Sequence, residues 1–260
     1  MARWCGSSSG ASMSADPAAL LAAPPLVAPL LTAHDIESGY GKVQVLWGAE
    51  LAVAERASVV LLGPNGAGKT TFLKVLLGLM PTWRGTITFA GTDITAWPSD
   101  RRVRLGMAYM SEIGVFTALS IAENLAIGGQ FAQPAALRRR LEVLYAAFPD
   151  LAARRSAAAG SLSGGQRKML GIAKALAGSP RLLVMDEPSA GLSPLFVGQV
   201  IAILRQFHED GLALLIAEQN VKFLDLADHV ITLEGGRTGF SGSVAALMED
   251  DQLHRAYFGL

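Results

Sequence analysis

The chain has a single cysteine, no excess of charge of either sign, and no uninterrupted apolar run of about 18 residues, the length a membrane-spanning helix needs. The lone Cys5 excludes an intramolecular disulfide framework and favours a reducing, cytoplasmic setting. Because 22 basic residues balance 22 acidic residues, no bulk positive field attracts nucleic acid, and we expect no nucleic acid partner. The apolar share is nevertheless high, at 51%, so we expect the protein to lie beside a membrane and not within it.

The first 30 residues have the pattern of neither a transmembrane helix nor a signal peptide. Prolines interrupt the uncharged stretch from Pro17 to Ala33, so it cannot form one continuous helix across a membrane. In a signal peptide, a basic residue directly precedes the apolar segment, whereas Arg3 lies far from this stretch. A composition rich in Gly, Ser, Ala and Pro buries too little surface to offset the entropy of ordering these residues. We therefore predict a disordered leader over residues 1–30 and one folded domain over residues 31–260.

Short apolar runs alternate with helical patterns after the leader, which favours an α/β fold with a largely parallel sheet. Ala57 to Leu62 is predicted to be a buried strand. A glycine-rich turn follows it, and then Thr70 to Met80 carries apolar residues at helical spacing. Further strands are expected at Leu182 to Met185, Leu212 to Ala217 and Val230 to Leu233.

Helical signals dominate between about residues 96 and 178, which predicts a helical subdomain inserted into the α/β unit. One apolar stripe ends at Pro149 and consists of Leu137, Leu141, Leu144, Tyr145 and Phe148. Three arginines at residues 138–140 interleave with this stripe. They form either a solvated helix face or a contact with a membrane partner or lipid headgroups.

The segment from Gly63 to Thr70 has the P-loop pattern and lies between a predicted strand and a predicted helix, as that motif requires. Its glycines let backbone N–H groups surround phosphate oxygens at the positive end of the helix. Lys69 would bridge the β- and γ-phosphates of ATP, and the Thr70 hydroxyl would coordinate Mg²⁺. The alternative is a glycine-rich turn that only caps a helix. The candidate nucleotide-binding residues here are Gly63, Pro64, Asn65, Gly66, Ala67, Gly68, Lys69, Thr70 and Thr71.

Two acids follow the apolar strand that ends at Met185, and a strand of this kind delivers carboxylates to the edge of a sheet where ligands bind. Asp186 would hold Mg²⁺ through its water shell. Glu187 would act as the general base that deprotonates the attacking water. Taken alone, the Asp-Glu-Pro step could equally be a loop that favours a helix start.

Ser163 and Gln166 have the spacing of a capping box at the start of a helix that runs to about Ala177. The simpler interpretation is a capped helix and nothing more. Gly164 and Gly165 would, however, leave N–H groups open to an anion, so the same feature is a candidate second phosphate-binding surface.

The stretch Leu162-Ser-Gly-Gly-Gln166 closely resembles the signature motif of ABC ATPases, and the P-loop and the Asp186-Glu187 pair stand in that family's order. The resemblance covers about Leu31 to Leu260. It implies the ABC ATPase form of the P-loop NTPase fold, with a mixed-sheet core and an inserted helical subdomain. It also implies a head-to-tail dimer in which Ser163, Gly164, Gly165 and Gln166 act on a nucleotide bound by the partner. Tyr40 matches the aromatic residue that stacks on adenine; without the resemblance it would be read as packing.

Several segments look most like the smaller ATPase of branched-chain amino acid importers. They are Tyr109-Met-Ser-Glu112 with Val115-Phe116, Glu187-Pro-Ser-Ala-Gly-Leu-Ser-Pro194, Ala217-Glu-Gln-Asn220, and Ala256-Tyr-Phe-Gly-Leu260. The resemblance implies a peripheral ATP hydrolase on the cytoplasmic face of the membrane. Its expected partners are a second ATPase subunit, membrane permeases and, indirectly, a periplasmic solute-binding protein.

Three positions depart from the general family pattern. Glu112 stands where most members have a glutamine that contacts Mg²⁺ and senses the membrane subunit, so it is a candidate ligand of the metal and the nucleotide. Ser193 stands where most have an aspartate, and Gln219 where most have a histidine that touches the γ-phosphate. Gln219 joins Lys69 and Glu187 as an expected catalytic residue.

Other functions remain open from the sequence alone. The transported solute binds other subunits, so a urea, amide or other importer, or a lipid exporter, is an alternative within transport. Ser193 and Gln219 suggest a nucleotide-gated regulatory subunit with little turnover. A soluble ABC ATPase of repair or translation is disfavoured, because the chain shows no second ATPase domain, coiled coil or basic patch.

Overall fold

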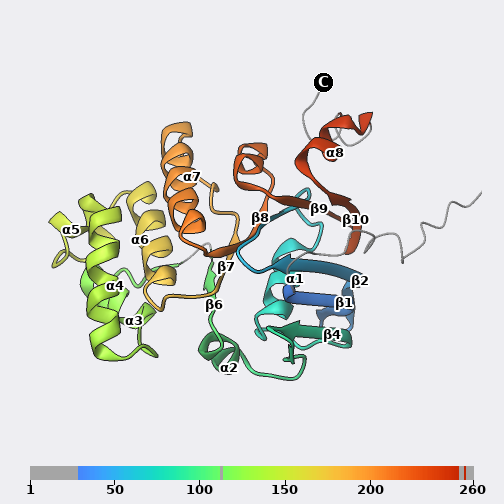
Figure 1. Cartoon of the computed structure of the whole chain (residues 1–260), viewed down its shortest axis with the longest axis horizontal. Coiled ribbons are helices and arrows are strands. Elements are labelled where there is room, and N and C mark those ends of the chain that lie inside the picture. Colours follow the sequence, from blue (N-terminus) through green and yellow to red (C-terminus); the bar gives the residue numbers. More distant parts are fainter. Residues whose placement is uncertain (1–28, 112–113, 252–254, 256–260) are drawn as a thin grey trace, which may run out of the picture.

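The computed structural model of the chain describes residues 29–111, 114–251 and 255, and it contains two β-sheets with helices around them (Figure 1). The first sheet is antiparallel, with strand order β2-β1-β4-β5. Its strands are β1 (Pro29–Tyr40), β2 (Val43–Ala54), β4 (Arg84–Phe89) and β5 (Thr92–Asp93). The predicted domain boundary at residue 31 therefore falls two residues inside β1.

The second sheet has strand order β10-β9-β3-β8-β7-β6, and all its neighbouring pairs are parallel except β9 with β10. Its strands are β3 (Ser58–Leu62), β6 (Met107–Met110), β7 (Leu182–Asp186), β8 (Ala213–Glu218), β9 (His229–Glu234) and β10 (Arg237–Gly242). The strands expected from the apolar runs are confirmed as β3, β7, β8 and β9. Together the two sheets make the fold mixed α/β.

Residues of β3 divide between two apolar cores, one on each face of the second sheet. Val59 and Leu61 pack with the first sheet and with Phe72 of α1 (Lys69–Leu76). Val60 and Leu62 face the opposite core, to which helices α3 to α8 contribute. This two-residue alternation is the side-chain period of a strand buried on both faces. The predicted helix after the glycine-rich turn is confirmed as α1, although it ends at Leu76 and not at Met80.

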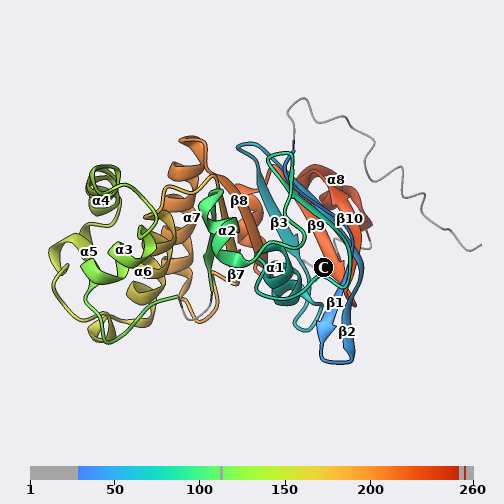
Figure 2. The ribbon, with the colours of Figure 1, turned by 90° about the horizontal axis from the view of Figure 1, so that it is seen from below.

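Helices α3 to α6 gather at the end of the molecule away from β1, β2 and β4, as both views show (Figures 1 and 2). The helices are α2 (Ser99–Arg104), α3 (Ile121–Gly128), α4 (Pro134–Ala147), α5 (Pro149–Ala153), α6 (Gly164–Leu176), α7 (Pro194–Glu209) and α8 (Val244–Glu249). Short 3₁₀ helices form at η2 (Ala159–Ser161) and η3 (Val221–Leu226). One strand, β6, lies inside the range 96–178 that was expected to be helical, and it pairs with β7 at the edge of the second sheet.

The apolar stripe predicted for residues 137–148 faces the core from α4 and its C-terminal end, with Leu144 and Phe148 buried. Arg138 and Arg139 are exposed. Arg140 instead packs inward, where its Nε donates to the Leu176 carbonyl at 3.0 Å and its guanidinium lies 4.9 Å from the centre of the Phe207 ring. The arginine run is therefore part solvated face and part packing contact.

Arg102 of α2 is buried and ties the end of α1 to the chain that follows it. Its guanidinium donates to the carbonyls of Val75 and Leu76 at 3.0 and 2.7 Å, and to those of Trp97 and Thr95 at 3.0 Å each. The last carbonyls of a helix need such donors, because they have no partner within the helix. In the described part of the chain, no helix is both long and apolar enough to cross a membrane.

Candidate functional site

The glycine-rich loop connects the carboxyl end of β3 to the first residue of α1, as its motif requires. Gly66 and Gly68 have φ angles of 81° and 104°, a left-handed region that glycine enters without a steric penalty. A Cβ atom at Gly63 would lie 2.5 Å from the Leu233 carbonyl oxygen, so this position also needs glycine. No side chain caps the start of α1, whose N–H groups are therefore available to phosphate oxygens.

Lys69 is the first residue of α1, and only 4% of its side chain is exposed. Its ammonium donates to the carbonyls of Gly63 and Pro64 at 2.7 and 3.2 Å, and it lies 3.3 Å from Oε1 of Glu187. These contacts hold the positive charge over the loop, where a phosphate group would meet it.

Asp186 ends β7 beside the start of α1. Its Oδ1 accepts a hydrogen bond from the Thr70 hydroxyl at 3.1 Å, and its Oδ2 accepts one from the Tyr109 hydroxyl at 3.3 Å. Burial raises the pKa of Asp186, an effect that the Thr70 hydrogen bond opposes and the neighbouring Glu187 charge reinforces. The side-chain oxygens of Thr70 and Asp186 lie side by side. Mg²⁺ prefers oxygen ligands, so these two residues fit that ion.

Glu187 adopts a left-handed backbone with φ of 46°, which is uncommon for a residue with a side chain. Such a conformation costs about 1–3 kcal/mol and persists where the surroundings hold it. Here the N–H of Glu187 donates to the Ala217 carbonyl at 2.9 Å, and its own carbonyl accepts from the N–H of Ala190 and the ammonium of Lys168, each at 3.1 Å. The backbone of this acid is therefore fixed from three directions.

Gln219 follows β8 and reaches across the loop. Its Nε2 donates to Asn65 Oδ1 at 2.8 Å and to Glu187 Oε1 at 3.3 Å. Beneath it the buried Glu218 accepts hydrogen bonds from the N–H groups of Ser189, at 2.7 Å, and of Gln219, at 2.9 Å. Glu218 thus orders two loops at once.

The expected catalytic residues Lys69, Glu187 and Gln219 meet beside one cavity of about 270 Å³. This cavity is lined by Val45, Asn65, Gly66, Gly68, Lys69, Thr70, Thr71 and Glu187. Tyr40 ends β1 with 51% of its surface exposed, and its hydroxyl accepts a hydrogen bond from the Thr71 hydroxyl at 3.5 Å.

The capping box predicted at Ser163 is confirmed at the start of α6. The Ser163 hydroxyl accepts from the Gln166 N–H at 3.2 Å, and the Gln166 side chain accepts from the Ser163 N–H at 3.1 Å. An added Cβ at Gly164 would meet open space, whereas one at Gly165 would lie 2.8 Å from the Phe196 ring. Gly164 therefore faces outward, and Gly165 allows α7 to pack against α6.

Residues 46–190 match the family model described as ABC transporter. The chain belongs to the ABC transporter ATP-binding family. Among its relatives is the high-affinity branched-chain amino acid transport ATP-binding protein BraG of Pseudomonas aeruginosa, which is 35% identical over 232 residues, 88% of this chain and 100% of that protein. The lipopolysaccharide export system ATP-binding protein LptB of Acidithiobacillus ferridurans is 36% identical over 234 residues, 88% of this chain and 97% of that protein.

Solved structures support the fold assignment. A nucleotide-free ATP-binding cassette from an ABC transporter superposes with a TM-score of 0.79 at 23% identity, and the match covers 88% of this chain and 99% of that one. The ABC ATPase fold predicted from the signature resemblance is therefore confirmed.

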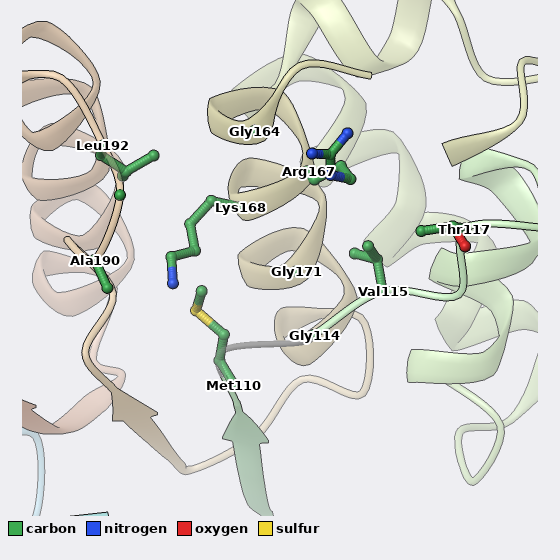
Figure 3. A pocket seen from close by; sticks show the side chains of 11 residues that line it. Met110, Gly114, Val115, Thr117, Gly164, Arg167, Lys168, Gly171, Ala190 and Leu192 are labelled. Carbon is green, nitrogen blue, oxygen red and sulfur yellow. The ribbon is translucent and has the colours of Figure 1, made fainter. Parts of the chain in front are cut away.

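The signature residues of this ABC ATPase lie apart from its own P-loop. Among the described residues, none of the four from Ser163 to Gln166 lines the cavity beside Lys69. Gly164 instead lines a second cavity of about 350 Å³ between α6, residues 114–117 and the segment 190–192 (Figure 3).

The three departures from the family pattern have different outcomes. Glu112 lies outside the described residues, so its expected role as a ligand stays a prediction. Ser193 caps α7, since its hydroxyl accepts from the Phe196 N–H at 3.5 Å. Gln219 lies beside Glu187, and its expected contact with the γ-phosphate stays a prediction.

Three residues that contact the site were not predicted from the sequence: Tyr109, Glu218 and Lys168. No local pattern in the sequence indicates the contacts of Tyr109 or Lys168. Glu218 adjoins Gln219 at the end of a predicted strand, and that position was the one signal that could have indicated it.

Proposed function

We propose that this ABC ATPase powers the import of a small polar solute, most specifically branched-chain amino acids. The observation that carries ATP hydrolysis is the convergence of Lys69, Thr70, Asp186 and Glu187 beside the P-loop cavity. The choice of solute is supported by the local sequence matches and by the full-length similarity to BraG.

The P-loop N–H groups and Lys69 would bind the phosphates of ATP. Thr70 and Asp186 would hold Mg²⁺, which neutralises phosphate charge when bound. Glu187 would accept a proton from water as the water oxygen attacks the γ-phosphorus, and the bond to the β-phosphate breaks to leave ADP and phosphate. Gln219 would orient this water and donate to a γ-phosphate oxygen.

The signature residues would serve a nucleotide held by a second ATPase subunit, because none of the four lines the chain's own P-loop cavity. Ser163 and the N–H groups at the start of α6 offer a surface suited to phosphate. Closure of such a dimer on ATP, and its reopening after hydrolysis, would drive the membrane permeases. The exposed Phe116 and its neighbour Val115 are proposed contacts with those permeases at the cytoplasmic membrane face.

Two alternatives rest on specific observations. The similarity to LptB at 36% identity supports a lipid exporter. The replacement of the usual aspartate and histidine by Ser193 and Gln219 supports a regulatory subunit with little turnover.

Uptake assays in cells that carry only the Glu187→Gln form of the chain separate these possibilities. Loss of radiolabelled leucine uptake, with urea uptake unchanged, is expected for a branched-chain amino acid importer. Normal leucine uptake together with defective lipid export would replace the proposal with the exporter. Phosphate release by the purified wild-type complex no faster than by the Glu187→Gln complex would favour the regulatory subunit.

A further inference from the structure

A lysine one turn into α6 makes a contact that the hydrolysis mechanism does not use. Lys168 has only 8% of its surface exposed, and its ammonium donates to the backbone carbonyl of Glu187 at 3.1 Å. Figure 3 shows its side chain extending from α6 across the second cavity toward the segment that carries Ala190, beside Met110. Lysine is seldom buried unless polar groups compensate its charge, and the Glu187 carbonyl is one such group here.

The acceptor of this hydrogen bond belongs to the strained residue of the site. The left-handed backbone of Glu187 directs its side chain toward Lys69 and Gln219, both 3.3 Å from Oε1. The Ala190 N–H also donates to the Glu187 carbonyl, but that bond closes a turn within the same loop. Lys168 is the donor that comes from a different element, and it therefore anchors the loop to α6.

The helix that carries Lys168 also carries the signature residues. Ser163 caps its first turn, and Lys168 follows about one and a half turns later. Gly165 lets the Phe196 ring of α7 lie against the same end of the helix. A displacement of α6 would therefore act on the Glu187 carbonyl through the Lys168 side chain.

We infer that Lys168 is a positioning residue that fixes the peptide of Glu187 and joins the signature helix to the catalytic acid of the same chain. This inference rests on the proposed function, in which the signature engages the partner's ATP and Glu187 hydrolyses the chain's own. Lys168 thereby links the two nucleotide sites of the dimer. Lys168 would therefore affect the position of the Glu187 carboxylate and not the binding of ATP, since it does not line the P-loop cavity.

Substitution of Lys168 separates positioning from general damage. Lys168→Met keeps the apolar stem and removes the donor. We expect the affinity for ATP, measured by calorimetry without Mg²⁺, to stay within about twofold of wild type, while kcat falls on the order of tenfold or more, as expected for the loss of a charge-assisted hydrogen bond. Lys168→Arg, which keeps a charged donor, should recover most of the turnover. Lys168→Gln, with a shorter neutral donor, should be intermediate and serves as the test variant if Lys168→Met does not fold.

Lys174→Met is the matched control. Lys174 lies on the same helix and is also partly buried, but its ammonium lies 4.7 Å from the centre of the Phe116 ring, away from Glu187. The kcat of Lys174→Met should match that of the wild-type protein. The double variant Lys168→Met/Glu187→Gln should still form an ATP-dependent dimer in gel filtration, because the start of α6 is unchanged.

A kcat of Lys168→Met within twofold of wild type would overturn the inference, as would loss of the ATP-dependent dimer in the double variant. The proposed function fails in a different way. If Glu187→Gln alone keeps wild-type turnover, the catalytic assignment is wrong. If Glu187→Gln stops turnover while Lys168→Met and Lys168→Gln keep it, only the positioning role is wrong.

Discussion

The ammonium of Lys69 lies 3.3 Å from the carboxylate of Glu187 and so connects the start of the P-loop helix to the acid after β7. Both groups are at least partly shielded from water, with 4% and 29% of their side chains exposed. A γ-phosphate entering the loop would compete with Glu187 for this ammonium. We therefore expect ATP binding to change the position of the Glu187 carboxylate through its ion pair with Lys69.

Lys69→Ala should abolish useful ATP affinity, because the phosphates lose their principal charged side-chain partner. Charge-assisted hydrogen bonds are worth about 1.5–3 kcal/mol each, so we expect the affinity to fall by on the order of tenfold to a hundredfold or more. Titration with a fluorescent ATP analogue measures this. Lys74→Ala, in the last turn of the same helix, should bind normally. Tight binding by Lys69→Ala would contradict the P-loop assignment.

Ser163→Arg should leave ATP binding by the monomer intact and block the closed dimer, because it places bulk and positive charge where the partner's phosphate would approach. Ser243→Arg is a matched control, since Ser243 likewise caps a helix, α8. That variant should still dimerise with ATP. Loss of ATP binding by the Ser163→Arg monomer would show that the signature does not act in trans.

Much of the site could be predicted because its parts are local in sequence. The P-loop, the acids after β7 and the capping box of α6 each occupy a few consecutive residues, whose spacing reports their geometry. The resemblance to ABC ATPases then indicated that the P-loop and the two acids serve one nucleotide, and that the signature residues serve the partner's.

The missed features depend on long-range pairing. Tyr109 meets Asp186 only because β6 pairs with β7, and Lys168 meets Glu187 only because α6 packs beside that sheet. The antiparallel sheet was also missed. Shifts in register between β1 and β2 interrupt the alternation of buried and exposed residues that would have indicated these strands.

Gln219→His should raise turnover several-fold, because a protonated imidazole stabilises charge on the γ-phosphate better than a neutral amide does. The ratio of the turnover of Gln219→His to that of wild type should increase as the pH falls through about 6.5, where histidine gains its proton. Gln219→Ala should be slower than wild type. Phosphate release measured across this pH range tests the prediction, and a histidine variant no faster than wild type would show that the amide is a competent substitute.

If Gln219 does limit turnover, we expect the chain to work opposite a non-identical ATPase with the usual histidine, and its own P-loop site to be the slower of the two. Glu187→Gln should then reduce the ATPase activity of the complex less than the matching change in the partner does. Equal losses would argue against this asymmetry.

Arg102→Met should destabilise the fold by roughly 3 kcal/mol or more, because two buried and two partly buried carbonyls lose charge-assisted donors. Burial lowers the pKa of Arg102 to about 10, which still leaves the guanidinium charged at neutral pH. Urea denaturation measures the loss. Arg101→Met, which removes only a contact 5.8 Å from the centre of the Trp97 ring, should change stability by less than about 0.5 kcal/mol. Equal stability of the two variants would contradict this account of Arg102.

The most direct test of the central claim is phosphate release by Glu187→Gln, measured together with gel filtration in ATP and Mg²⁺. The amide keeps the shape of the carboxylate and removes the base, so we expect ATP binding and an ATP-dependent dimer to persist while turnover falls about a hundredfold or more. Turnover at the wild-type rate would remove Glu187 from the catalytic role and contradict the proposed mechanism.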